Sequence, residues 1–75
     1  MKTLEQILAY EKDRRYEDGD YGINACKEAI QIKLKYNPDR TLYTLLETYV
    51  KRANEDPFFN KHMVLACWEM INEKG

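Results

Sequence analysis

A chain of 75 residues is long enough for one domain with a thin core, so we treat residues 1–75 as a single helical domain. Twelve basic residues against thirteen acidic ones give a formal charge of −1, which argues against a dedicated nucleic-acid binder because such proteins neutralise phosphates with an excess of lysine and arginine. A hydrophobic content of 44% excludes a disordered chain, and no apolar run approaches the roughly 20 residues of a membrane-spanning helix.

The first predicted helix covers residues 4–17. Thr3 and Gln6 have the spacing of a capping box, in which each side chain accepts a hydrogen bond from the backbone N–H of the other residue. One apolar stripe follows at helical spacing and consists of Leu4, Ile7 and Leu8. Glu11 and two arginines occupy the next positions of that stripe, so we expect the buried face to stop before Glu11. Gly19 is expected to end the segment.

The second predicted helix covers residues 21–36 and follows Asp20, a suitable N-cap. Its apolar residues occupy two adjacent faces. One face carries Ile23, Cys26, Ile30 and Leu34, and the other carries Ala25, Ala29, Ile32 and Tyr36. A helix with so broad an apolar surface is expected to sit centrally, in contact with more than one neighbour.

The rest of the chain is divided by two residue pairs that end in proline, Asn37-Pro38 and Asp56-Pro57. The residue before a proline avoids the helical conformation, and proline is favoured at the first position of a helix. Asn37 and Asp56 are therefore predicted to cap two further helices, over residues 38–53 and 57–72. The stripe of the third helix is Leu42, Leu45, Leu46, Tyr49, Val50 and Ala53. The stripe of the fourth is Phe59, Met63, Ala66, Cys67 and Met70, with His62 at its edge.

Together these segments predict an all-α protein. We expect a compact small bundle of four helices, with helix two central and Asn/Asp-Pro turns before helices three and four. Three long helices with a looser first one are the alternative arrangement.

The residues that could perform catalysis are few and badly spaced. The chain contains no serine. Cys67 lies about 140° around the fourth helix from His62, so the two side chains do not face each other. Cys26 and Cys67 both belong to apolar faces, where a thiol stays protonated and unreactive. We therefore predict that the protein is not an enzyme.

No pattern typical of a metal or cofactor site is found. One histidine and two distant cysteines lack the ligand spacing of a zinc site. The acidic cluster of residues 17–20 lacks the alternating oxygen ligands and the terminal glutamate of a calcium-binding loop. A helix end, a turn and a cap account for that cluster, so we predict no metal and no cofactor.

Two surfaces carry side chains that a single buried face does not explain. Two arginines continue the stripe of the first helix and have tyrosines close by, and both residue types are enriched at interface hot spots. Three large apolar side chains form a second side of the fourth helix. The predicted protein-binding residues are Arg14, Arg15, Tyr16, Phe58, Leu65 and Trp68. The alternatives are arginine stems that cover the core and apolar side chains that are buried under the first helix.

A basic and aromatic patch around Tyr36 and Tyr43 indicates nucleic acid as the alternative partner. Its candidate residues are Lys33, Lys35, Arg40, Lys51 and Arg52. The alternative explanation of the lysines is an ordinary solvated helix end, because cations suit the C-terminus of a helix.

The function expected from these observations is a small protein-binding or regulatory module. Met1 leads directly into the first helix with no signal segment, so we expect a cytoplasmic protein with reduced cysteines. The expected partner is a protein, with self-association into a homodimer left open. Nucleic acid is less favoured as a partner, and no membrane is expected.

Overall fold

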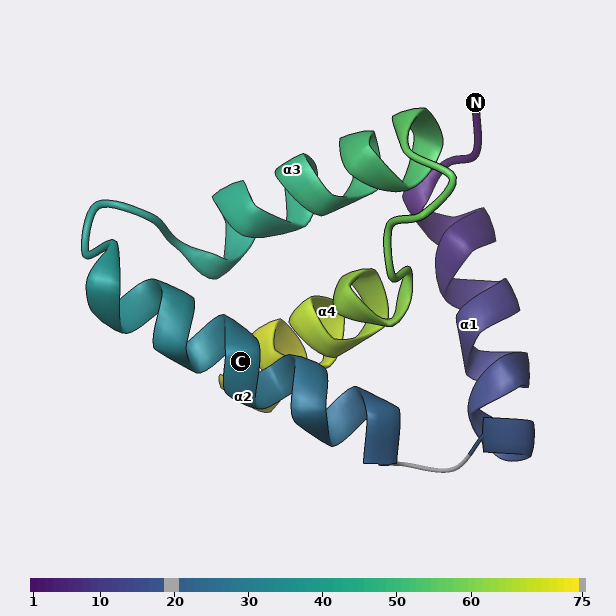
Figure 1. Ribbon diagram of the computed structural model, residues 1–75, viewed down its shortest axis with the longest axis horizontal. Helices are drawn as coiled ribbons and strands as arrows, with labels where there is room; N and C mark the ends of the chain where they lie inside the picture. The colour runs from purple at the N-terminus through teal and green to yellow at the C-terminus, as the bar shows by residue number, and fades with distance from the viewer. Residues whose placement is uncertain (19–20, 75) are drawn as a thin grey trace.

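The computed structural model describes residues 1–18 and 21–74, without the side chains of residues 14–18, 21 and 74. The regular elements are α1 (Leu4–Asp18), α2 (Tyr21–Tyr36), α3 (Leu42–Glu55) and α4 (His62–Lys74) (Figure 1). The all-α prediction is confirmed. The bounds of α1 and α2 agree with the predicted ones to within one residue. The expected helix stop Gly19 and the expected cap Asp20 lie outside the described residues.

The helix around which the others are arranged is α4. In Figure 1, α2 and α3 diverge from the loop that joins them, α4 lies between them, and α1 stands across their open side. Four consecutive residues of α4, from Val64 to Cys67, are fully buried. A helix turn that is buried all round needs neighbours on every side, and α1, α2 and α3 supply them. The prediction that helix two is central is therefore wrong.

The core is formed by apolar side chains from all four helices. Its buried members are Ile7, Leu8, Ile23, Cys26, Ile30, Leu42, Leu45, Leu46, Tyr49, Val64, Leu65, Ala66, Cys67 and Met70. Glu11 is buried beside them, with only 1% of its surface exposed. The expectation that the buried face of α1 stops before Glu11 is wrong, because His62 of α4 contacts the carboxylate there.

The turn between α2 and α3 differs from the predicted one. The Asn37 side-chain amide donates to Lys33 O at 2.8 Å, so this residue ends α2 and does not open α3. Pro38 lies in a turn in which Arg40 N–H donates to Asn37 O at 3.0 Å. α3 begins four residues later than predicted, because Thr41 caps it: Thr44 N–H donates to Thr41 Oγ1 at 3.2 Å, and Thr41 N–H donates to Thr44 Oγ1 at 3.0 Å.

The loop before α4 is also longer than predicted. Asp56 ends α3 by donating its N–H to Arg52 O at 2.8 Å, and its Oδ1 accepts from Phe58 N–H at 2.9 Å. The aspartate therefore holds a turn that includes Pro57 and does not cap a helix. Asn60 Oδ1 accepts from His62 N–H at 3.0 Å, and α4 begins at His62.

The N-terminal segment is tied to the end of α3. The capping box of α1 is confirmed, since Gln6 N–H donates to Thr3 Oγ1 at 3.3 Å and Thr3 N–H donates to Gln6 Oε1 at 2.9 Å. Asn54 Oδ1 accepts from Lys2 N–H at 2.7 Å, and Asn54 Nδ2 donates to Lys2 O at 2.9 Å. Within the described ranges, none of the helices combines the length and apolar character needed to cross a membrane.

The cap of α3 can be tested by substitution. Thr41→Ala should lower the free energy of unfolding by about 1 kcal/mol, because it removes the oxygen that accepts from Thr44 N–H. Thr41→Ser keeps that oxygen and should stay within about 0.5 kcal/mol of the parent chain. Urea unfolding followed by circular dichroism measures both variants, and equal stability of the two would show that the cap contributes nothing.

Candidate functional site

An apolar stripe runs along the exposed face of α2. Its four residues are Ala25, Ala29, Ile32 and Tyr36, and all four are exposed. Ile32 and Tyr36 keep 57% and 74% of their surface accessible to solvent. At 100° per residue the four side chains lie within about 60° of one another around the helix. We call this set the α2 stripe.

The α2 stripe faces away from the core. The residues of α2 that pack into the core are Ile23, Cys26, Ile30 and Leu34. Their mean direction lies about 130° around the helix from the stripe, so α2 has one apolar face in the core and one in solvent. The stripe residues are spaced by four, three and four, which is the alternation of the a and d positions of a heptad repeat. The sequence shows this spacing, but it does not distinguish a second core face from an exposed one.

Charged side chains border the α2 stripe on both flanks. Glu28 and Lys35 lie on one flank, seven residues apart, and Lys33 lies on the other. All three are exposed. The Nζ of Lys33 also lies 5.8 Å from the centre of the Tyr49 ring. An apolar strip with charged borders has the composition of a surface that packs along another helix.

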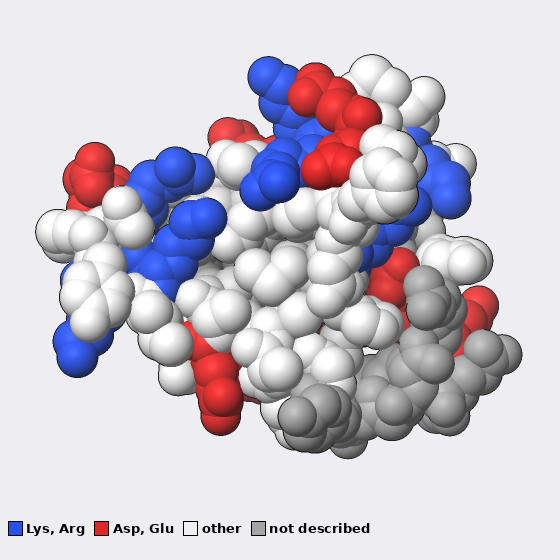
Figure 2. Space-filling model, in the orientation of Figure 1, with Lys and Arg blue, Asp and Glu red and all other residues white. Residues whose placement is uncertain are grey.

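The basic residues predicted to bind nucleic acid fall into two groups, and the first lies where α2 passes into α3. Figure 2 shows Lys and Arg side chains gathered at this end of the molecule. Lys33 and Lys35 are exposed there, as is Tyr43, with 68% of its surface accessible. Arg40 is only partly exposed, and its Nη2 donates to Thr48 Oγ1 at 3.0 Å. The side chains at this end that are exposed to a partner are therefore Lys33, Lys35, Tyr36 and Tyr43.

The second group, Lys51 and Arg52, lies near the opposite end of α3. Ten residues separate Arg52 from the start of α3, which is about 15 Å along the helix axis. The Arg52 guanidinium lies 5.0 Å from the centre of the Phe59 ring and 3.7 Å from Asp56 Oδ2. The fold does not bring the five basic residues into one continuous patch.

The predicted protein-binding residues whose side chains the structure describes do not share one surface. Leu65 is fully buried, so its prediction as a surface residue is wrong. Trp68 is half-buried and packs against the core. Phe58 lies in the loop before α4 and keeps 94% of its surface exposed. The side chains of the other three predicted residues, Arg14, Arg15 and Tyr16, lie outside the described residues.

Two hollows of modest volume lie elsewhere on the described surface. The first, of about 350 Å³, is lined by Lys12, Trp68, Glu69, Asn72 and Glu73. The second, of about 380 Å³, is lined by Met1, Lys2, Leu4, Leu46, Glu47, Val50, Lys51 and Asn54. Both volumes are near the lower end of the range for small-molecule sites. The polar side chains that line the two hollows are all at least partly exposed.

The buried polar contact between α1 and α4 is formed by Glu11 and His62. The Nδ1 of His62 lies 2.8 Å from Glu11 Oε2. Gly22 of α2 packs against the imidazole, since a Cβ at this position would lie 3.3 Å from His62 Cδ2. Within the described residues, Glu11 Oε1 has no hydrogen-bond partner. The His62 ring of α4 therefore contacts both α1 and α2, and 14% of its side-chain surface is exposed.

The two cysteines are buried and free, and neither is prepared to act as a nucleophile. Burial raises the pKa of the Cys26 thiol, and the nearby carboxylate of Glu11 raises this pKa further. Asn60 Nδ2 lies 3.7 Å from Cys26 Sγ and donates to it. Burial raises the pKa of Cys67 to about 11, and its Sγ donates to Leu42 O at 3.2 Å. Both sulfurs thus stay in the thiol form near neutral pH.

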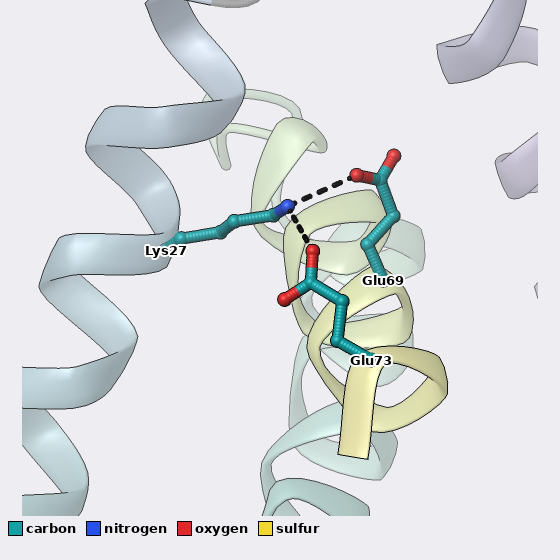
Figure 3. Close-up of polar contacts among 3 residues, drawn as sticks. All are labelled: Lys27, Glu69 and Glu73. Carbon is teal, nitrogen blue, oxygen red and sulfur yellow. Dashed lines mark hydrogen bonds and ion pairs between the residues drawn. The ribbon is translucent and has the colours of Figure 1, made fainter. Parts of the chain in front are cut away.

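A polar network joins α2 to α4 on the outside of the bundle. In Figure 3, Lys27 of α2 reaches between two glutamates of α4, with Nζ 3.1 Å from Glu69 Oε1 and 2.8 Å from Glu73 Oε1. The hydrogen bond to Glu73 is the main reason why the pKa of Lys27 is raised. Because this lysine is held by two carboxylates, it serves the packing of α2 on α4. Among the described residues, no three His, Cys, Asp or Glu side chains are grouped so as to hold a metal ion.

The contact between Glu11 and His62 can be tested by a double-mutant cycle. His62→Leu should be strongly destabilising, because it leaves the carboxylate of Glu11 buried without a partner. The same substitution should cost much less in a Glu11→Leu background, with a coupling free energy of about 1–3 kcal/mol from urea unfolding. Additive effects of the two substitutions would contradict this interpretation.

The state of the cysteines can be tested by alkylation. At about pH 8, near the ordinary pKa of a thiol, iodoacetamide should leave both cysteines of the folded chain unmodified. The same treatment in denaturant should modify both, because unfolding removes the burial that raises each pKa. Mass spectrometry counts the adducts, and rapid alkylation of Cys26 in the folded chain would contradict this interpretation.

The comparisons with known proteins complete the description of the site. The chain matches no protein-family model, no curated protein and no solved structure.

Proposed function

We propose that this protein is a small protein-binding module that acts through the α2 stripe. The observation that carries the proposal is the exposure of four apolar side chains at heptad spacing on one face of α2. Burying a side chain of the size of Ile32 contributes about 1.5–3 kcal/mol, and Tyr36 adds a large aromatic surface. A partner helix of matching spacing would remove both side chains from water.

The mode of binding that fits this surface is a helix packed along a helix. Ala25 and Ala29 are small, so they let a partner backbone approach closely at one end of the α2 stripe. Ile32 and Tyr36 project further and would enter spaces between the side chains of the partner. The charged residues on the flanks would then select partners by the sign of their charges.

A binding role fits the state of the reactive side chains better than catalysis does. The two thiols are buried and protonated, and Glu11 and His62 contact each other inside the bundle. We place the module in the cytoplasm, because two free, buried cysteines suit a reducing compartment.

Site-specific photo-crosslinking tests the proposal. A photo-reactive phenylalanine analogue in place of Ile32 should form covalent adducts with protein in cells that produce the chain. The control places the same analogue at Gln31, which is exposed on the polar side of the same helix. Adducts at position 32 and not at position 31 would support the α2 stripe as the binding surface, whereas no protein adduct at position 32 would overturn the proposal.

Nucleic-acid binding is the second candidate function. The observation in its favour is the exposure of two tyrosines, Tyr36 and Tyr43, at the same end of the molecule as Lys33 and Lys35. Fluorescence anisotropy with a labelled single-stranded oligonucleotide at low salt tests it. Binding that weakens with salt and is lost in Lys35→Glu would favour this candidate, and no binding would remove it.

A further inference from the structure

We propose that the partner of the α2 stripe is the α2 stripe of a second copy of this chain, packed antiparallel about a twofold axis. This inference rests on the proposed function, because it names the occupant of the same surface. Two properties of the stripe carry it, the order of its side-chain sizes and the charges on its flank, and its length sets the expected strength.

The order of side-chain sizes makes the stripe complementary to itself. Two small residues, Ala25 and Ala29, are followed by two large ones, Ile32 and Tyr36. When two such helices run antiparallel, the small end of each lies against the large end of the other. Ala25 then lies opposite Tyr36 of the second copy, and Ala29 lies opposite Ile32. Each layer pairs one small and one large side chain, which fills the space evenly.

A parallel pairing lacks this complementarity. It places Ala25 against Ala25 and Tyr36 against Tyr36, so the helices would be forced apart at one end and leave a gap at the other. Cavities and overpacking both lower the stability of an interface. The sizes of the side chains therefore favour the antiparallel direction.

The charges on the flank agree with the same arrangement. Glu28 and Lys35 are exposed on one side of the stripe, and neither has an ion pair within the described residues. In the antiparallel pair, Glu28 of each copy lies near Lys35 of the other. The twofold axis produces this contact twice, as expected for an interface in which the same surface is used by both copies. A parallel pair would instead bring Glu28 of each copy near Lys33 of the other. The parallel and antiparallel arrangements therefore make different predictions for substitutions at Lys35.

The length of the α2 stripe sets the expected strength. Eleven residues separate Ala25 from Tyr36, which is about 17 Å of helix. Such an interface is at or below the lower end of the size range of specific complexes, so the association should be weak, with Kd of about 1 µM to 1 mM. The dimer is therefore expected to form in a concentration-dependent manner.

Sedimentation equilibrium over a range of concentrations tests the inference. The apparent mass of the parent chain should rise from 9.0 kDa towards twice that value as its concentration increases. Ile32→Glu should stay at the mass of the monomer, because it places a carboxylate at the centre of the interface. Gln31→Glu changes a neighbouring exposed position outside the stripe and should associate like the parent chain. Circular dichroism confirms that each variant is folded.

A charge exchange tests the direction of packing. Glu28→Lys and Lys35→Glu should each raise the Kd by about tenfold, because each turns two attractive contacts into repulsive ones. The double variant with both substitutions restores opposite charges across the antiparallel interface and should return to within about threefold of the parent Kd. In a parallel dimer the double variant would still place the lysine introduced at position 28 beside Lys33, so the absence of rescue would overturn the antiparallel arrangement.

The two proposals fail in different ways. A parent chain that remains at 9.0 kDa up to about 1 mM, or a dimer that Ile32→Glu leaves intact, would overturn self-association through the α2 stripe. The proposed function would survive that result if position 32 crosslinks to a protein of another sequence. An adduct of two copies of the chain at position 32 would support both proposals.

Discussion

The complete burial of one turn of α4, from Val64 to Cys67, is the constraint on which the arrangement of the other helices depends. Each apolar side chain of this turn gains stability only if a neighbour removes it from water on its own side of the helix. α2 covers one side, α3 covers another, and α1 closes the third. The central position of α4 thus follows from apolar side chains on all its sides, which a single neighbour could not cover.

The same constraint explains why α2 keeps an exposed apolar face. A helix at the periphery of a small bundle contributes one face to the core, and the Ile23 side of α2 fills that role against α4. No described segment covers the side that carries the α2 stripe. In a domain of this size the core is thin, and a second apolar face on a peripheral helix has to be covered by another molecule or stay in water.

Polar contacts between the helices favour this packing over alternatives. The carboxylate of Glu11 meets the imidazole of His62 inside the bundle, and the ammonium group of Lys27 meets two carboxylates of α4 at its edge. Loss of the contact between Glu11 and His62 would leave a buried polar group without its partner, which costs more than a misplaced apolar contact. The single histidine of the chain thus takes part in the packing of the helices.

Local properties of the sequence determined the helical class, the bounds of α1 and α2 and the capping box at Thr3, because periodicity and caps act within one or two turns of chain. The starts of α3 and α4 depended on which of several polar residues accepts from the free N–H groups of the first turn. Thr41 and Asn60 do so, while Asn37 and Asp56, which precede the prolines, hold turns. Periodicity shows that a face is apolar, but it does not say which neighbour covers that face. Only the tertiary structure therefore decided that Leu65 and Glu11 are buried, that α4 and not α2 is central, and that the second apolar face of α2 is left to solvent.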